Sequence, residues 1–143
     1  GLYAGVGASQ ADRDQAAAVL GATGLVLWVE DESLMHAVTA VSGSGPAYFF
    51  YWMEAMIAAG QQLGLSEQVS RDLTLQTALG AAQMAITSGE ATAKLRQNVT
   101  SPNGTTQAAL ESMAQHQVGE LIQQALLAAA ARREALSSAL DRG

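Results

Sequence analysis

The sequence contains no cysteine among its 143 residues. This absence excludes disulfide bonds, thiolate metal sites and thiol catalysis, and it fits a reducing compartment, so a cytoplasmic location is predicted. Histidine is also scarce. His36 and His116 lie far apart in the sequence and neither has a second ligand four residues away, so no metal site is expected.

Charged residues make up only 14% of the chain, and the formal net charge is −6. Apart from the pair Arg132 and Arg133, the seven Lys and Arg residues are scattered, which excludes the basic surface that nucleic acids require. No apolar run approaches the roughly 20 residues of a membrane span. The 49% of hydrophobic residues are enough for a core. Because the chain is poor in charge and rich in alanine, it is also expected to bury much of its surface against a second chain.

The first 30 residues differ in pattern from the rest. A short apolar segment comes first, Ser9 and Asp12 resemble a capping box, and Gly21 should end the helix that they begin. Residues 25–29 are apolar and predict a buried strand. This strand, helix and strand, without a glycine-rich phosphate loop, predict that residues 1–30 are the remnant of a nucleotide-binding α/β domain of the Rossmann type. The chain is therefore expected to be a fragment of a longer protein.

From residue 31 to residue 143 the pattern is helical. Asp31 or Ser33 can cap the first helix, and the Gly-Ser-Gly-Pro run at 43–46 predicts a kink, because proline disfavours α geometry at Gly45 and removes an amide. Further helices are expected over about 48–63, 66–87, 92–97, 106–115 and 118–140. Ser66 is expected to cap the second of these, and Ser88-Gly89 should end it. The predicted fold class is mainly α, a bundle of five or six helices.

Residues 100–106, Thr-Ser-Pro-Asn-Gly-Thr-Thr, place hydroxyls and backbone amides where a helix is about to start. Pro102 fixes its own φ, Asn103 and Gly104 tolerate positive φ, and the two threonines are expected at the helix cap. A helix N-terminus offers unpaired N–H groups and partial positive charge. The turn therefore predicts an anion site on the amides from Gly104 to Thr106. A capped turn between two helices, with no ligand, is the alternative.

Two long motifs lie in the helical part. Residues 99–106 read V-T-S-P-N-G-T-T, and residues 37–48 read A-V-T-A-V-S-G-S-G-P-A-Y. They resemble two signatures of the pyrroline-5-carboxylate reductase family, V-T/S-S-P-G-G-T/A-T and A-V-T-x-x-S-G-S-G-P-A-Y, and the similarity covers essentially the whole chain. Asn103 departs from the family's usual glycine. Asparagine is the next best residue for a left-handed conformation, so the turn is expected to survive.

The resemblance implies a fold and an activity. It implies that residues 31–143 are a helical dimerisation and substrate-binding domain, an intertwined homodimer through residues 35–63 and 118–140. The full enzyme would transfer a hydride from NADPH or NADH to the C=N carbon of 1-pyrroline-5-carboxylate and give L-proline, the final step of proline biosynthesis. The cofactor would be bound mainly outside this chain, so the chain alone is expected to be inactive.

The resemblance also assigns roles to the turn. Thr106 matches the family threonine that hydrogen-bonds the ring nitrogen, and it is the expected catalytic residue. Hydride adds more readily to an iminium than to a neutral imine, so a hydroxyl near that nitrogen would position the ring or relay a proton. Ser101 and the amides of Gly104 and Thr105 would hold the substrate carboxylate.

Three further residues receive roles in the same way. Asn98 matches a cofactor contact, Glu32 matches a position near the substrate, and Thr39 is a weaker candidate beside the kink. Two alternatives stay open at this point. The chain could be an oligomerisation module without activity, or the helical domain of another imine or 3-hydroxyacid reductase. The hydroxyacid group generally supplies a catalytic lysine, but Lys94 is the only lysine and it precedes the signature turn.

Overall fold

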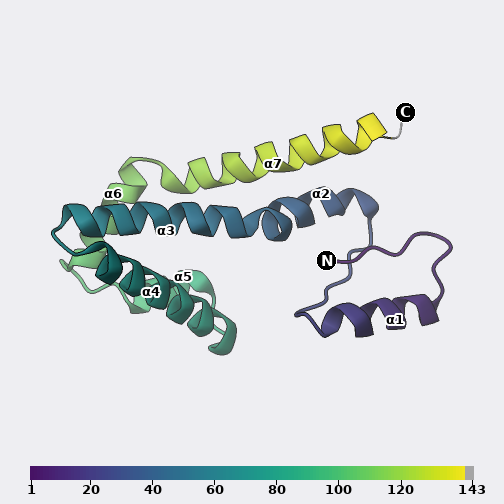
Figure 1. Ribbon diagram of the computed structural model, residues 1–143, viewed down its shortest axis with the longest axis horizontal. Helices are drawn as coiled ribbons and strands as arrows, with labels where there is room; N and C mark the ends of the chain where they lie inside the picture. Colours follow the sequence, from purple (N-terminus) through teal and green to yellow (C-terminus); the bar gives the residue numbers. More distant parts are fainter. Residues whose placement is uncertain (141–143) are drawn as a thin grey trace. The chain divides into compact units, whose positions relative to one another are not determined.

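A computed structural model describes residues 1–140 of the chain (Figure 1). The residues group into two units, and each is described by itself. Unit 1 holds Gly1–Gly45 and the described chain from Gln124 onward, and unit 2 holds Pro46–Gln123. The domain boundary predicted at residue 30 comes from the sequence pattern, whereas these two units are defined by their internal contacts. The predicted boundary therefore stays a prediction.

The described chain is helical for most of its length, which confirms the predicted fold class. In chain order the elements are α1 (Gln10–Gly21), the 3-10 helix η1 (Glu32–Leu34), α2 (Met35–Val38), the π-helix η2 (Thr39–Gly43), α3 (Gly45–Gln62), α4 (Glu67–Thr87), α5 (Thr92–Asn98), α6 (Thr105–Gln115) and α7 (Val118–Leu140). Within the described residues, no helix combines the length and the hydropathy of a membrane span.

The predicted capping box at the start of α1 is confirmed. Ser9 Oγ accepts from the Asp12 N–H at 3.2 Å, and Asp12 Oδ2 accepts from the Ser9 N–H at 2.8 Å. The hydrogen bonds from the Ser9 hydroxyl and backbone lower the pKa of Asp12. A lowered pKa means that the cap contributes fully above the ordinary aspartate pKa and is lost as the pH falls through the lowered one.

Residues 25–29 do not form the buried strand that their sequence predicts. Leu2 and Trp28 make one isolated parallel bridge, and Leu25 is 84% exposed. The bridge consists of two hydrogen bonds of 2.8 Å, from the Leu2 N–H to the Leu27 carbonyl and from the Val29 N–H to the Leu2 carbonyl. Parallel pairing is stable mainly inside larger sheets covered on both faces. The pairing of Leu2 with Trp28 therefore does not extend into longer strands within the described chain.

The interruption predicted at residues 43–46 is confirmed, but it begins earlier, at Thr39. There the helix widens to a π-helix, in which the Ser44 N–H donates to the Thr39 carbonyl at 2.8 Å. Thr39 Oγ1 donates to the Met35 carbonyl at 2.8 Å. Pro46 then falls in the first turn of α3, where a missing amide costs nothing.

Helices α3 and α4 of unit 2 approach each other closely where small residues meet. Ser66 caps α4 as predicted, because its Oγ accepts from the Val69 N–H at 3.3 Å. One turn on, Ser70 is only 2% exposed, and a Cβ added at Gly60 would lie 2.7 Å from Ser70 Oγ and 3.0 Å from Ser70 Cβ. A glycine is therefore required at position 60 of α3.

Replacing Gly60 by alanine is expected to lower the free energy of unfolding by about 1 to 3 kcal/mol, because the methyl group would force α3 and α4 apart. Ser70→Ala removes a buried Oγ that has no hydrogen-bond partner in the described structure, so this change should be neutral or stabilising and should partly rescue Gly60→Ala. Gly21→Ala is the control, since nothing lies within 4 Å of its added Cβ. Urea denaturation at one protein concentration compares the unaltered chain with the three single variants and the double variant. An unchanged free energy of unfolding in Gly60→Ala would contradict the close approach.

The described chain has almost no apolar core of its own. Ala40 is its one buried hydrophobic residue. Large apolar side chains on the helices are exposed instead, and Phe49 on α3 is 67% exposed. Apolar faces of this extent are typical of surfaces that bind another chain.

Candidate functional site

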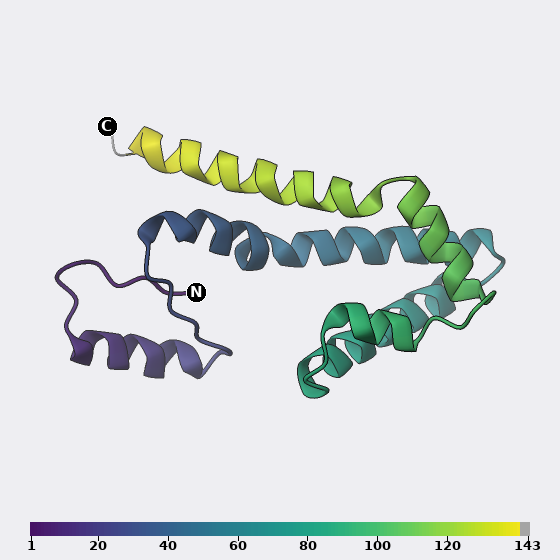
Figure 2. The same ribbon diagram turned by 180° about the vertical axis from the view of Figure 1, so that it is seen from behind.

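The segment between α5 and α6 folds into a tight turn in unit 2 (Figure 2). The Gly104 N–H donates to the Ser101 carbonyl at 3.1 Å, which closes the turn. Asn103 has a φ of 58°, so the left-handed conformation expected at this departure from the family motif is confirmed. Gly104 itself has a φ of −87°, which any residue can adopt.

Gly104 is needed for space rather than for a positive φ. A Cβ added there would lie 3.1 Å from the backbone oxygen of Ser101. The backbone oxygen cannot rotate away as a side chain can, so a larger residue would open the turn. Glycine at position 104 therefore keeps Ser101 close to the start of α6.

Helix α6 begins without a side-chain cap, which corrects the expectation that the threonines cap it. The N-cap is Gly104, and no side chain bonds to the first turn. The Ala108 N–H is the first to find a helical partner, the Gly104 carbonyl at 3.2 Å. The preceding amides of Thr105, Thr106 and Gln107 are left available, as at any uncapped helix start. Because the Gly104 N–H is already used within the turn, these three amides are the open donors.

The side chain of Gln107 locks the turn from inside the helix. Its Oε1 accepts from the Asn103 N–H at 2.8 Å, and its Nε2 donates to Glu111 Oε1 at 2.7 Å. Sequence reasoning missed this contact. It could have been predicted from the glutamine at the third position of α6, because a Glu or Gln at that position often accepts from a backbone amide before the helix.

The hydroxyl groups near this helix start are exposed. Thr100 uses its hydroxyl internally, donating to the Arg96 carbonyl at 2.6 Å. The hydroxyls of Ser101, Thr105 and Thr106 make no hydrogen bond to any part of the chain that the structure describes. Free hydroxyls and open amides therefore gather at one helix start with partial positive charge.

Asn98 ends α5, just before the turn. Its Nδ2 donates to Glu90 Oε2 at 3.0 Å, a contact that joins the two ends of α5. Glu90 follows Gly89, whose φ of 70° turns the backbone after α4. Sequence reasoning did not single out Glu90, and its spacing of eight residues from Asn98 carries no recognised signal.

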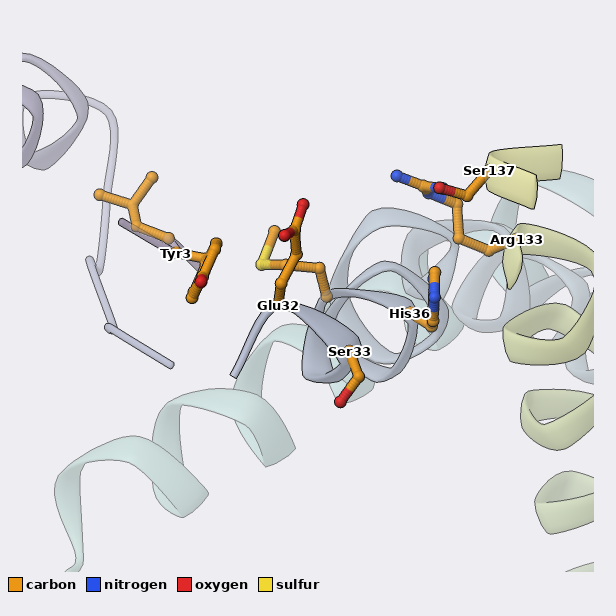
Figure 3. A pocket seen from close by; sticks show the side chains of 9 residues that line it. Tyr3, Glu32, Ser33, His36, Arg133 and Ser137 are labelled. Carbon is orange, nitrogen blue, oxygen red and sulfur yellow. The ribbon is translucent and has the colours of Figure 1, made fainter. Parts of the chain in front are cut away.

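The other site candidates lie in unit 1. Glu32 lines a cavity of about 600 Å³, and in Figure 3 its carboxylate and the guanidinium of Arg133 extend into the same space. His36 also lines it, and its Nδ1 is buried without a hydrogen-bond partner in the described structure. The full lining is Gly1, Leu2, Tyr3, Glu32, Ser33, Met35, His36, Arg133 and Ser137. No group of three or more potential metal ligands occurs among the residues described here.

Comparison with known proteins decides the family. A family model described as pyrroline-5-carboxylate reductase dimerisation matches residues 32–136. The chain belongs to this family. A pyrroline-5-carboxylate reductase of Pseudomonas aeruginosa is 54% identical over 140 residues, which is 98% of this chain and 51% of the relative. The Arabidopsis thaliana reductase is 39% identical over 93% of this chain and 48% of its own length.

Solved reductase structures share the fold. The Coxiella burnetii reductase superposes with a TM-score of 0.89 at 41% identity, covering 94% of this chain and 50% of that one. The Plasmodium falciparum reductase, solved with NADP bound, gives a TM-score of 0.85 at 30% identity, covering 92% of this chain and 52% of that one. This chain thus spans about half the length of its reductase relatives. The match with reductases of this family also removes the basis for a 3-hydroxyacid reductase.

Proposed function

We propose that this chain is the substrate-binding and dimer-forming part of an enzyme that reduces 1-pyrroline-5-carboxylate to L-proline with NADPH or NADH. The observation that carries the proposal is the start of α6, where three open amides stand beside the free hydroxyls of Ser101 and Thr106. Membership in the reductase family supports it. A cytoplasmic location and a homodimer are parts of the same proposal.

The start of α6 is suited to the carboxylate of the substrate. The open N–H groups of Thr105 and Thr106 would donate to its oxygens, and the positive end of the helix favours a negative charge. The Ser101 hydroxyl is held nearby by the turn that Gly104 closes. Gly104 contributes to substrate binding chiefly through this close approach, since its own amide is already paired.

Thr106 would act on the ring nitrogen. The bound nicotinamide supplies the hydride, and the protein must favour the protonated form of the imine that accepts it. The Thr106 hydroxyl can donate to the ring nitrogen or relay a proton to it. Its own pKa is too high for it to be the ultimate acid, so water must reprotonate it.

The remaining site residues also receive roles in the proposed enzyme. We assign Glu32 to the substrate side, supported by its exposed carboxylate at the edge of a cavity in unit 1. Thr39 is a weaker candidate because its hydroxyl already donates to the Met35 carbonyl, although its oxygen can still accept. Asn98 would contact the cofactor, and its exposed amide, anchored on one side only, suits a polar contact to a dinucleotide.

The chain alone is expected to bind NADPH weakly or not at all. Residues 1–30 would be the remnant of the cofactor domain, in line with a family match that begins at residue 32. Dinucleotide binding normally relies on a glycine-rich loop at a helix N-terminus, and Asn98 cannot replace one. Isothermal titration of this chain with NADPH should show no heat of binding at micromolar concentrations. A micromolar dissociation constant would contradict the assignment.

A hybrid protein tests the function. In the hybrid reductase, this chain replaces the aligned half of the Pseudomonas aeruginosa relative. The proposal predicts that the hybrid oxidises NADPH in the presence of pyrroline-5-carboxylate and forms L-proline in equal amount. A folded, oligomeric hybrid that forms no L-proline would instead support an oligomerisation module without activity.

A further inference from the structure

A side-chain hydrogen bond links Glu90, which precedes α5, to Asn98 at the end of that helix. Glu90 lies just before Ala91, the N-cap of the helix, and Asn98 is the last helical residue. Seven helical residues extend about 10 Å. The Glu90 and Asn98 side chains meet across this helix, where Asn98 Nδ2 donates to Glu90 Oε2 at 3.0 Å.

A turn of the backbone and one local hydrogen bond hold Glu90 in place for its contact with Asn98. The positive φ of Gly89 turns the chain after α4, and the Glu90 N–H then donates to Ser88 Oγ at 3.2 Å. The Glu90 backbone is therefore fixed by the break between α4 and α5. Its carboxylate, by contrast, is exposed and has Asn98 as its partner.

The chemistry of the partner fixes the orientation of the Asn98 amide. An ionised carboxylate only accepts hydrogen bonds, so the NH₂ end of the asparagine must face Glu90 and the carbonyl end must face away. Without the carboxylate, the amide could rotate by half a turn at little cost. Glu90 thus decides that Asn98 offers Oδ1, an acceptor, on its open side.

We propose that Glu90 is a positioning residue for cofactor binding. By holding Nδ2, it would leave Asn98 Oδ1 as the acceptor for a donor group of NAD(P)H, such as a ribose hydroxyl or the carboxamide N–H. This inference rests on the proposed function, because it takes Asn98 as a cofactor contact. It adds a residue that acts through Asn98 and need not touch the cofactor.

A purely structural role for Glu90 predicts a different result. A glutamate just before a helix also favours the positive end of that helix, so its loss could simply weaken α5. Such weakening would lower the melting temperature and would not depend on the side chain at position 98. A dependence on Asn98 is therefore the decisive readout.

The experiment is a double-mutant cycle in the hybrid reductase, with NADPH as the probe. Glu90→Ala, Asn98→Ala and the double variant are compared by the dissociation constant for NADPH, measured from protein fluorescence without turnover, and by melting temperature. Glu90→Gln keeps the length but no longer fixes the amide orientation. Asp72→Ala is the matched control, since it removes another exposed carboxylate that accepts from an amide, Gln68 Nε2 at 2.8 Å.

The proposal predicts that Glu90→Ala weakens NADPH binding by about 3- to 10-fold, as expected when the Asn98 amide loses one neutral hydrogen bond to NADPH. The same change should have no further effect once Asn98 is alanine. Glu90→Gln should fall between wild type and Glu90→Ala, and Asp72→Ala should match wild type. The KM for pyrroline-5-carboxylate should stay unchanged in Glu90→Ala.

Two results would overturn the proposal. One is an unchanged NADPH dissociation constant in Glu90→Ala. The other is a loss of NADPH affinity on Glu90→Ala that is equally large with and without the Asn98 side chain. A hybrid that binds no NADPH would overturn it as well. Since binding is measured without turnover, a hybrid that binds NADPH through Asn98 and Glu90 but forms no proline would contradict the proposed function alone.

Discussion

Replacing Thr106 by alanine in the hybrid reductase is expected to lower kcat by about 10- to 1000-fold, the range for one positioned polar group. The hydroxyl would donate to the ring nitrogen mainly as iminium character develops, so its loss falls on turnover more than on binding. The melting temperature should not change. The N-cap of α6 is Gly104, and Thr106 makes no capping hydrogen bond whose loss would destabilise the helix.

Two neighbouring variants serve as controls for this experiment. Ser101→Ala should raise the KM for pyrroline-5-carboxylate with little change in kcat, because a carboxylate contact exists equally in the ground and transition states. Thr105→Ala removes a similar exposed hydroxyl one residue earlier and keeps the backbone amide. It should leave kcat within a few-fold of wild type. Wild-type turnover in Thr106→Ala would refute the catalytic role.

The second large effect concerns the apolar faces of α3 and α7, since the chain is expected to be a homodimer. Phe50 on α3 is 60% exposed and Leu127 on α7 is 70% exposed. If both lie in a dimer interface, Phe50→Glu or Leu127→Glu buries two unpaired charges per dimer, because a symmetric interface repeats each change. Each such charge costs about 3 to 5 kcal/mol. Two charges per dimer therefore cost at least about 6 kcal/mol, and the dimer dissociation constant should rise at least about 10⁴-fold.

Light scattering at micromolar concentration measures this effect directly. The unaltered chain should have twice its chain mass of 14.7 kDa, and each glutamate variant should have the mass of one chain or fail to stay soluble. Gln10→Glu, on α1 outside the helices assigned to the interface, is the control and should stay dimeric. A stable 14.7 kDa species for the unaltered chain would contradict the dimer.

Large apolar side chains that are exposed on the described helices support the expectation of a partner. A second copy of the chain is the occupant that the family's dimerisation domain favours.

The helical fold could be predicted from sequence because its signals are local. The capping box of Ser9 and Asp12, the Ser66 cap and the helix-breaking glycine at position 89 each specify a helix end through residues at most four apart. These predictions are confirmed. The prediction of a strand at residues 25–29 is wrong because a strand depends on pairing with neighbouring strands, which the local sequence pattern does not reveal.

The candidate site shows the same limit. The motif predicted the turn and the conformation of Asn103, because a left-handed residue before a helix leaves a local signature. It did not predict that Gly104 would be the N-cap, or that Gln107 would take the Asn103 amide. The partnership of Glu90 with Asn98 was also out of reach, because a contact across a whole helix follows no short periodicity.

A crystal structure of the hybrid reductase with L-proline bound tests the central claim most directly. The account predicts that the proline carboxylate lies at the start of α6, within hydrogen-bonding distance of the Thr105 and Thr106 amides and of Ser101 Oγ. The ring nitrogen should lie within hydrogen-bonding distance of Thr106 Oγ1. Proline bound elsewhere, or bound at the turn with its ring nitrogen directed away from Thr106, would contradict the account.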